Sequence, residues 1–216
     1  MRNAEKDARE MKGRRDLMLE TGFRVFAKKG IEGVTLQEVA DACGIGIATL
    51  YRYFSTKLAF VIEIGTRKWN EYYKEVEAEF SRRGGDKMNA AEELDFYLSS
   101  YIVLYREHRD ILAFNQNFNS YIIHEAATPA QLRDYMNAIE AFSVKFHKMY
   151  EKGRIDGSIA TDEPERSMFV STMHIMLAVA ARFAQGVVYS DGNKADLTGE
   201  LLNLKRMIMA QYVRAK

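Results

Sequence analysis

Cysteine and proline are scarce in this chain of 216 residues. Its single cysteine, Cys43, cannot form an internal disulfide, and this favours a reducing compartment. Only two prolines occur, and runs of β-branched residues are few, so we expect an almost entirely helical protein. Because Cys43 falls on the apolar face of an expected helix, we interpret it as a packing residue rather than a reactive one.

Long apolar segments are also missing. The first ten residues, MRNAEKDARE, lack the apolar core of a secretory signal. The longest apolar run, Ile175–Ala181, is far shorter than the roughly 20 residues that a membrane span needs. We therefore expect a cytoplasmic protein without a membrane partner.

Neither sign of charge is in large excess, because the net charge is only +1. The two parts of the chain differ, however. Residues 1–57 hold 11 Lys/Arg and 8 Asp/Glu, a balance of +3, whereas residues 58–216 hold 20 and 22, a balance of −2. The N-terminal part is thus the basic one, which modestly favours contact with nucleic acid there.

Patterns that indicate catalysis or metal binding are not found. Gly44-Ile45-Gly46 lacks the preceding strand and the third glycine of a nucleotide-binding loop. His147 and Glu151 are four positions apart, but the sequence indicates no third metal ligand. Ser/His/Asp sets and paired carboxylates are also missing. We predict that the chain is not an enzyme and has no metal and no cofactor.

Residues 35–57, TLQEVADACGIGIATLYRYFSTK, carry the most informative pattern. Thr35 is a favourable N-cap, and Glu38 completes a capping box. Three residues then share one face of a short helix: Val39, Ala40 and Cys43. Gly44 follows where the chain must turn.

A second short helix follows this turn. Leu50 and Phe54 give it a buried face, and Ile45 can fill the angle between the two helices. Small Ala40, Gly44 and buried Leu50 have the spacing of a DNA-binding helix-turn-helix.

Helical spacing continues through the rest of the chain. Residues 1–12 are expected to be frayed or to form an arm, and a helix over residues 13–29 is expected before the motif. Ser55 is expected to cap a long helix that reaches Phe80. After a break at residues 82–86, helices are expected over residues 89–108, 110–124, 129–152, 162–189 and 195–214, with a turn at 191–193. The prediction is an all-α protein of about nine helices.

The segment GRRDLMLETGFRVFAKKGIEGVTLQEVADACGIGIATLYRYFSTKLAFV resembles the N-terminal domain of the TetR (tetracycline-repressor) family of transcriptional regulators. The resemblance covers about the first 60 residues. It implies a helix-turn-helix DNA-binding domain, residues 1–57, and a larger helical domain for ligand binding and dimerisation, residues 58–216. It also implies a cytoplasmic homodimer, usually a repressor, whose larger domain holds a small-molecule pocket.

Two positions depart from the family pattern. Gly46 stands where members commonly have Ser or Thr, and Ile47 stands where they have Lys or another polar residue. Gly46 is a weaker N-cap than Ser. Ile47 cannot hydrogen-bond to a base edge, but it can contact a thymine methyl group.

Nine residues are expected to contact double-stranded DNA: Thr35, Gly46, Ile47, Ala48, Thr49, Tyr51, Arg52, Tyr53 and Lys57. Ile47, Ala48 and Thr49 would face base edges, and Arg52 is a possible reader of guanine. Both tyrosines would bind phosphates, as would Thr35 and Lys57 at helix N-termini. The alternatives are that a tyrosine packs in the core and that Lys57 is only solvated.

A two-fold dimer would place two recognition helices on a palindromic operator. The last two helices offer apolar surface for its interface: Met173, Leu177, Ala181, Leu201, Leu204 and Ile208. The alternative is that these residues form only internal core.

Aromatic residues with a few polar neighbours predict a pocket in the second part of the chain for a small apolar or aromatic ligand. The candidates are Tyr97, Tyr101, Tyr105, Phe114, Phe118, Tyr121, Phe142, Phe146 and His174. The alternative for each of them is an ordinary place in a helical core.

These patterns together predict a sequence-specific DNA-binding regulator, most simply a repressor that a small-molecule ligand releases from its operator. Two alternatives stay open. One is a DNA-binding protein without an inducer. The other is a helical ligand-binding protein with a degenerate helix-turn-helix, which Gly46 and Ile47 motivate.

Overall fold

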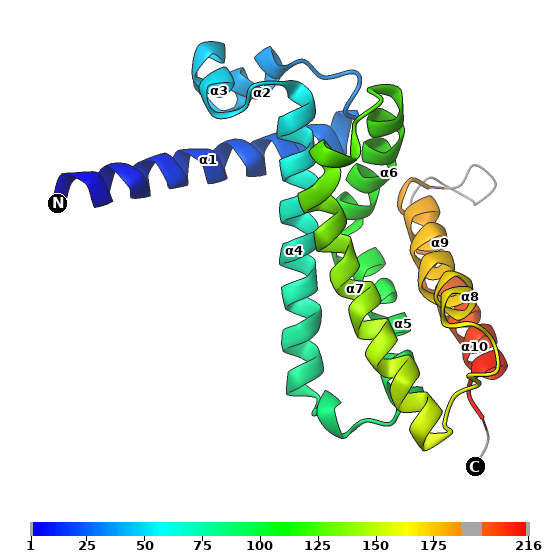
Figure 1. The fold of residues 1–216 in the computed structure, drawn as a ribbon. Helices are drawn as coiled ribbons and strands as arrows, with labels where there is room; N and C mark the ends of the chain where they lie inside the picture. Colours follow the sequence, from blue (N-terminus) through cyan, green and yellow to red (C-terminus); the bar gives the residue numbers. More distant parts are fainter. Residues whose placement is uncertain (1, 187–195, 215–216) are drawn as a thin grey trace. The chain divides into compact units, whose positions relative to one another are not determined.

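The computed structural model describes residues 2–186 and 196–214, and within these ranges it is helical without a strand (Figure 1). The helices are α1 (Arg2–Lys29), α2 (Leu36–Ala42), α3 (Ile47–Tyr53), α4 (Lys57–Arg82), α5 (Ala90–Glu107), α6 (Arg109–His124), α7 (Pro129–Asp156), α8 (Glu165–Phe169), α9 (Ile175–Ala184) and α10 (Thr198–Tyr212). A π-helical turn, Val170–His174, joins α8 and α9 into one rod. Nine helical rods are thus described, and the predicted all-α fold is confirmed.

The chain divides into two compact units. Unit 1 comprises Met1–Lys68 and Ala113–Met136, and unit 2 comprises Trp69–Leu112 and Asn137–Lys216. The divisions fall inside α4, α6 and α7, so each of these helices contributes residues to both units.

The core of unit 1 forms where α1 approaches the start of α4. The rings of Phe26 and Phe60 meet edge to face, with their centroids 6.0 Å apart, and both side chains are fully buried. Gly22 permits this approach, because a Cβ atom there would lie only 2.4 Å from the Phe60 ring. The close packing of α1 on α4 therefore depends on a residue without a side chain.

Several helix ends differ from those expected. α1 begins at Arg2, so residues 2–12 continue the helix instead of forming a frayed arm, and Lys6 and Glu10 support it as an i,i+4 pair 3.9 Å apart. α7 continues to Asp156 and ends before Gly157, whose φ is +68°. The cap of α4 is Thr56 rather than Ser55, because the Ala59 N–H donates to the Thr56 hydroxyl at 3.0 Å. The predicted turn at residues 191–193 lies outside the described residues.

Unit 2 is arranged around α5. Asn89 and Glu92 form a capping box at its start, and His108 closes its end. α9 and α10 both pack on α5 and lie side by side (Figure 1). In the π-helical turn the Thr172 hydroxyl donates to the Met168 carbonyl at 2.7 Å. The packing of α9 and α10 buries most of the large side chains of α5.

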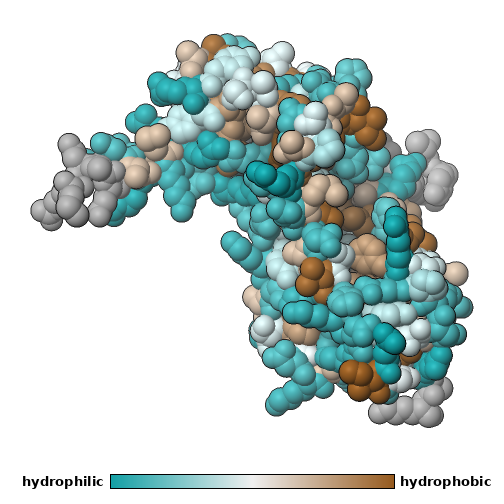
Figure 2. Space-filling view, in the orientation of Figure 1, coloured by the Kyte–Doolittle hydropathy of each residue, from teal (hydrophilic) through white to brown (hydrophobic). Residues whose placement is uncertain are grey.

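One helical segment of the described chain, Glu165–Ala184, is long and apolar enough by length and composition to cross a membrane. This segment contains the longest apolar run, Ile175–Ala181, and the few polar residues before and after that run do not lower the mean hydropathy below the criterion. The core helix of a soluble protein meets the same criterion, and this rod packs on α5 and α10. On the face shown in Figure 2, hydrophobic side chains form separate patches within a larger hydrophilic area.

Candidate nucleic-acid interface

The predicted capping box at the start of α2 is confirmed. The Glu38 N–H donates to the Thr35 hydroxyl at 3.2 Å, and the Thr35 N–H donates to the Glu38 carboxylate at 2.8 Å. The hydrogen bonds from Thr35, with a further one from Lys29, lower the pKa of Glu38. The start of α2 is therefore fixed by its own side chains.

A Schellman motif ends α2 and makes the turn of the helix-turn-helix. Gly44 has a φ of +67°, in the left-handed region that residues with a Cβ rarely adopt. The Ile45 N–H donates to the Ala40 carbonyl, and the Gly44 N–H donates to the Asp41 carbonyl, each at 3.0 Å. These bonds define the direction in which the chain enters α3.

α3 has one buried and one exposed face, as the sequence predicted. Leu50 is fully buried, and Phe54, the C-cap, is almost so. Ala48 and Arg52 are exposed, and Tyr51 is 51% exposed. Gly46 is the N-cap but makes no side-chain cap. The exposed face is the part of α3 that can meet another molecule.

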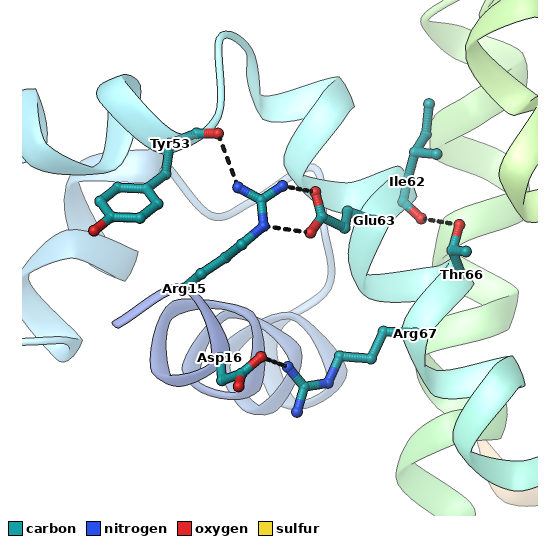
Figure 3. A network of polar contacts seen from close by, with 7 residues as sticks. All are labelled: Arg15, Asp16, Tyr53, Ile62, Glu63, Thr66 and Arg67. Carbon is teal, nitrogen blue, oxygen red and sulfur yellow. Dashed lines mark hydrogen bonds and ion pairs between the residues drawn. The ribbon is translucent and has the colours of Figure 1, made fainter. Parts of the chain in front are cut away.

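Arg15 of α1 ties the end of α3 to α4 (Figure 3). Its guanidinium makes two hydrogen bonds to the Glu63 carboxylate, the Nε–Oε1 bond being 2.8 Å long, and donates to the Tyr53 carbonyl at 3.3 Å. It also lies 4.5 Å from the centroid of the Phe54 ring. One side chain thus satisfies a terminal carbonyl of α3 and links it to two other helices. Sequence reasoning missed Arg15, since nothing nearby in the sequence indicates its distant partner.

Beside it, Asp16 and Arg67 form a second α1–α4 pair at 2.6 Å (Figure 3). Lys68 and Glu20 add a third pair at 2.7 Å. Because these pairs are part-exposed, their main effect is to fix how α1 lies on α4 rather than to add much stability.

The nine predicted DNA-contact residues all lie in unit 1, and five of them are exposed. The exposed ones are Thr35, Gly46, Ala48, Tyr51 and Arg52, and the half-buried ones are Ile47, Thr49, Tyr53 and Lys57. Thr35 already uses its hydroxyl and its amide in the capping box, so a phosphate at this helix start would have to bind the amides that follow.

The side chain of Lys57 is more deeply buried in unit 1 than that of a fully solvated lysine. Its ammonium lies 5.2 Å from the centroid of the Tyr121 ring, and 3.5 Å from the Glu32 carbonyl. Burial lowers its pKa, while the charges of Glu125, Glu32 and Glu38 oppose that shift. Burial and the nearby Glu125 and Glu32 raise the pKa of Tyr121 to about 12. Lys57 therefore joins the start of α4 to α6.

Four of the predicted pocket residues surround one cavity of unit 2: Tyr97, Tyr101, Phe142 and Phe146. Three others pack in unit 1. Phe114 contacts Phe23, Phe118 contacts Tyr135 at a centroid distance of 4.3 Å, and Tyr121 lies beneath Lys57.

The two remaining pocket candidates lie elsewhere. Tyr105 is fully buried and its hydroxyl accepts from the Leu197 N–H at 3.1 Å, whereas His174 is exposed. The structure therefore brings together only part of the predicted set.

Sequence reasoning missed Glu77 and Lys145, which line the same cavity. A signal for Glu77 was present. It lies four positions after Tyr73 and three before Phe80, so a carboxylate stands on the apolar face of α4.

Most of the predicted dimer-interface residues lie in the interior of unit 2. Met173, Ala181, Leu201 and Ile208 are buried, and Leu177 and Leu204 are half-buried. The same rods expose a different apolar set: Val170, Ile175, Leu202 and Met207.

Groups of three or more metal-ligating side chains are absent from the described residues. His147 pairs through Nδ1 with Glu165 at 2.9 Å rather than with Glu151.

The comparisons with known proteins agree with this geometry. Residues 18–64 match the bacterial regulatory proteins of the tetR family. The uncharacterized regulator YuxN of Bacillus subtilis is 27% identical over 142 residues, 63% of this chain and 44% of that protein. The repressor KstR2 of Rhodococcus jostii is 38% identical over 52 residues, 24% of this chain and 26% of that protein. The chain thus spans less than half the length of these relatives.

Solved structures of low sequence identity share the fold. A transcriptional regulator from Saccharomonospora viridis, in complex with choline, has a TM-score of 0.73 at 17% identity, covering 93% of this chain and 98% of that one. FadR of Bacillus subtilis, in complex with stearoyl-CoA, has a TM-score of 0.68 at 14% identity, covering 90% and 97%. By its N-terminal segment, residues 18–64, the chain is similar to the tetR family of bacterial regulatory proteins, and it shares its fold with the solved structures above.

Proposed function

We propose that the chain is a repressor that binds a palindromic operator as a homodimer and leaves it when a small molecule binds. DNA binding is assigned to residues 1–57, and ligand binding and dimerisation to residues 58–216. The observation that carries the proposal is the exposed face of α3, with Ala48, Tyr51 and Arg52 exposed and Leu50 buried behind them. The name of the similar KstR2 protein describes a repressor, which favours repression over activation.

The proposed contacts divide into base readers and phosphate binders. Ile47, Ala48 and Thr49 at the start of α3 face base edges, and Arg52 reads guanine. Ile47 supplies an apolar contact, for which a thymine methyl is the matching group. The phosphate backbone of the DNA is bound by five residues, Thr35, Gly46, Tyr51, Tyr53 and Lys57.

The ligand part of the proposal is supported by the cavity in unit 2. Similar folds have been solved with choline and with stearoyl-CoA, so a ligand site is compatible with this fold. Binding of the ligand would favour a dimer in which the distance between the two recognition helices does not match the two half-sites of the operator. A coupling of roughly 1–3 kcal/mol would weaken operator binding about 5–150-fold.

A dimer interface is proposed on the rods α8–α9 and α10. Val170, Ile175, Leu202 and Met207 are large apolar side chains that remain exposed there. Light scattering at micromolar protein concentration should give the mass of two chains, and a monomer would contradict this part. A cytoplasmic location and the absence of enzyme activity follow from the same proposal.

Selection of bound DNA from random oligonucleotides tests the proposal as a whole. We expect enrichment of a short palindrome whose half-sites are about one helical turn apart, roughly 34–36 Å. Enrichment of no sequence would contradict the regulator and would favour a ligand-binding protein with a degenerate helix-turn-helix. A broad screen for molecules that release the recovered operator then tests the ligand part separately.

A further inference from the structure

The first part of α1 projects beyond the other helices of unit 1 (Figure 1). Residues 6–14 are all exposed, and burial in the core begins only at Met18 and Leu19. We call residues 2–14 the α1 projection, and at 1.5 Å per residue it is roughly 20 Å long. An exposed helix of this length is only marginally stable in water. The core of unit 1 therefore does not explain why the chain extends α1 so far.

The α1 projection holds most of the excess positive charge of the N-terminal part of the chain. It contains 5 Lys/Arg and 3 Asp/Glu, a balance of +2, whereas residues 1–57 together have a balance of +3. The exposed cations among its described side chains are Lys6, Arg9, Lys12 and Arg14. Lys6 and Glu10 form an ion pair 3.9 Å long in which both side chains are more than half exposed, so this pair holds Lys6 only weakly. A polyanion is the partner that complements such a group of exposed cations.

The α1 projection begins beside the end of α3. Arg15, the residue that follows it, donates to the Tyr53 carbonyl at 3.3 Å and lies 4.5 Å from the centroid of the Phe54 ring. A helix in the major groove has the phosphates of both strands at its sides, and the neighbouring minor groove is only about 6 Å wide. A projection of roughly 20 Å that starts at the end of α3 is long enough to cross that groove. It can therefore reach phosphates outside the base pairs that α3 faces.

We propose that the α1 projection binds the phosphate backbone of the duplex DNA that flanks the base pairs contacted by α3. This inference rests on the proposed operator binding and adds a second contact surface to it, because the DNA contacts proposed above all lie in residues 35–57. Lys6, Arg9, Lys12 and Arg14 supply the charge. Since phosphate contacts carry no sequence information, the α1 projection adds affinity for flanking DNA without adding a base preference.

Two duplexes that differ only in length test this assignment. The short duplex ends at the selected palindrome, and the long one carries about ten further base pairs of unrelated sequence on each side, roughly one helical turn. Fluorescence anisotropy of the full chain at one fixed salt concentration gives the affinity for each duplex. We expect the wild type to bind the long duplex about fivefold or more tightly, because only that duplex offers the flanking phosphates.

Two variants with the same change in net charge locate the effect. The first exchanges the exposed cations of the α1 projection for alanine, the best helix former: Lys6→Ala/Arg9→Ala/Lys12→Ala/Arg14→Ala. The control exchanges four exposed cations of unit 2: Lys74→Ala/Lys87→Ala/Lys148→Ala/Arg154→Ala. We expect the first variant to bind the two duplexes within about twofold of each other and the control to keep the full preference. The slope of log affinity against log salt should be shallower by about 2 or more in the first variant than in the control, since each lost phosphate contact removes about 1.

A deletion separates DNA binding from folding. Removal of residues 2–10 takes away Lys6 and Arg9 but leaves Arg15 and the buried Met18 and Leu19 in place. The urea midpoint should stay nearly unchanged, because the described side chains among the removed residues are all exposed. The preference for the long duplex should fall in the deletion as well.

Three outcomes would overturn the assignment. They are equal binding of both duplexes by the wild type, a length preference that survives in the first variant, and an equal loss of that preference in the control. Light scattering adds a further test: a first variant that loses the dimer mass but keeps the length preference would assign the α1 projection to a second copy of the chain. If selection enriches no sequence, the proposed operator binding fails. The salt slope on a random-sequence duplex of one length then still tests the α1 projection, because its phosphate contacts do not depend on sequence.

Discussion

The helix-turn-helix of unit 1 and the cavity of unit 2 are stabilised over very different distances along the chain. In residues 35–57 the defining contacts join residues three to five positions apart, such as Thr35 with Glu38 and Ala40 with Ile45. The cavity is enclosed by side chains from residue 73 to residue 173. A single local change can therefore alter the turn, whereas the cavity depends on how four separate segments pack.

The largest expected effect is on the small core behind α3. Leu50→Ala removes a fully buried side chain and should lower the free energy of unfolding by about 2–5 kcal/mol. Ile123→Ala is the control, because Ile123 is 80% exposed and its loss should change stability by no more than about 0.5 kcal/mol. Urea unfolding measures both. Equal effects would show that α3 is not anchored through Leu50.

A smaller effect is expected at the long-range contact that the helix-turn-helix does need. Arg15→Ala removes the bonds to Glu63 and to the Tyr53 carbonyl together with the contact on Phe54. Since the pair is about one-third exposed, we expect a loss of roughly 1–2 kcal/mol in unfolding free energy. The neighbouring, exposed Arg14→Ala should leave the urea midpoint nearly unchanged. If both variants behave alike, the Arg15 clamp contributes nothing specific.

Two glycines of the motif give a matched test of local backbone conformation. Gly44→Ala should cost roughly 1–2 kcal/mol, because φ is +67° there although no atom crowds the added Cβ. Gly46 has an ordinary φ of −71° and is equally uncrowded. Gly46→Ser should therefore stabilise α3 by about a few tenths of a kcal/mol as a better N-cap. Thermal unfolding distinguishes them, and a stabilising Gly44→Ala would disprove the turn geometry.

The smallest effect is expected in unit 2, at the pair that links α7 to α8. The hydrogen bond and charge of Glu165 raise the pKa of His147 above its ordinary value. Because the folded pKa is the higher one, the stabilisation is complete below pH about 6.5 and is lost as the pH rises through the folded value. An NMR titration should give a pKa above about 6.5 for His147, falling back in Glu165→Gln. An unchanged pKa in that variant would remove Glu165 as the cause.

The same difference in the sequence distance between contacting residues explains which features of each region the sequence predicted. Thr35, Glu38, Gly44 and Leu50 could be assigned because caps, turns and buried faces depend on neighbours within one or two helical turns. The spacing of Phe114 and Phe118 predicted a helical face correctly, but not that it packs in unit 1.

Arg15, Glu77 and Lys145 show the limit of that reasoning. Each makes its defining hydrogen bond with a partner 38 to 68 positions away, which the local sequence pattern does not indicate. The predictions of helix ends were wrong for a simpler reason. Residues 2–12 are charged but contain no breaker, so the helix continues where low hydrophobicity suggested an arm.

The central claim is that the exposed face of α3 meets DNA, and a single negative charge added to that face tests it most directly. Ala48→Glu places a carboxylate on that face, while Ala130→Glu places the same group on an exposed position of α7 in unit 1. Affinity for the selected operator is measured by fluorescence anisotropy at one fixed salt concentration. We predict that Ala48→Glu weakens binding at least about tenfold and that Ala130→Glu changes it less than about threefold. Equal affinities of the two variants would contradict the account.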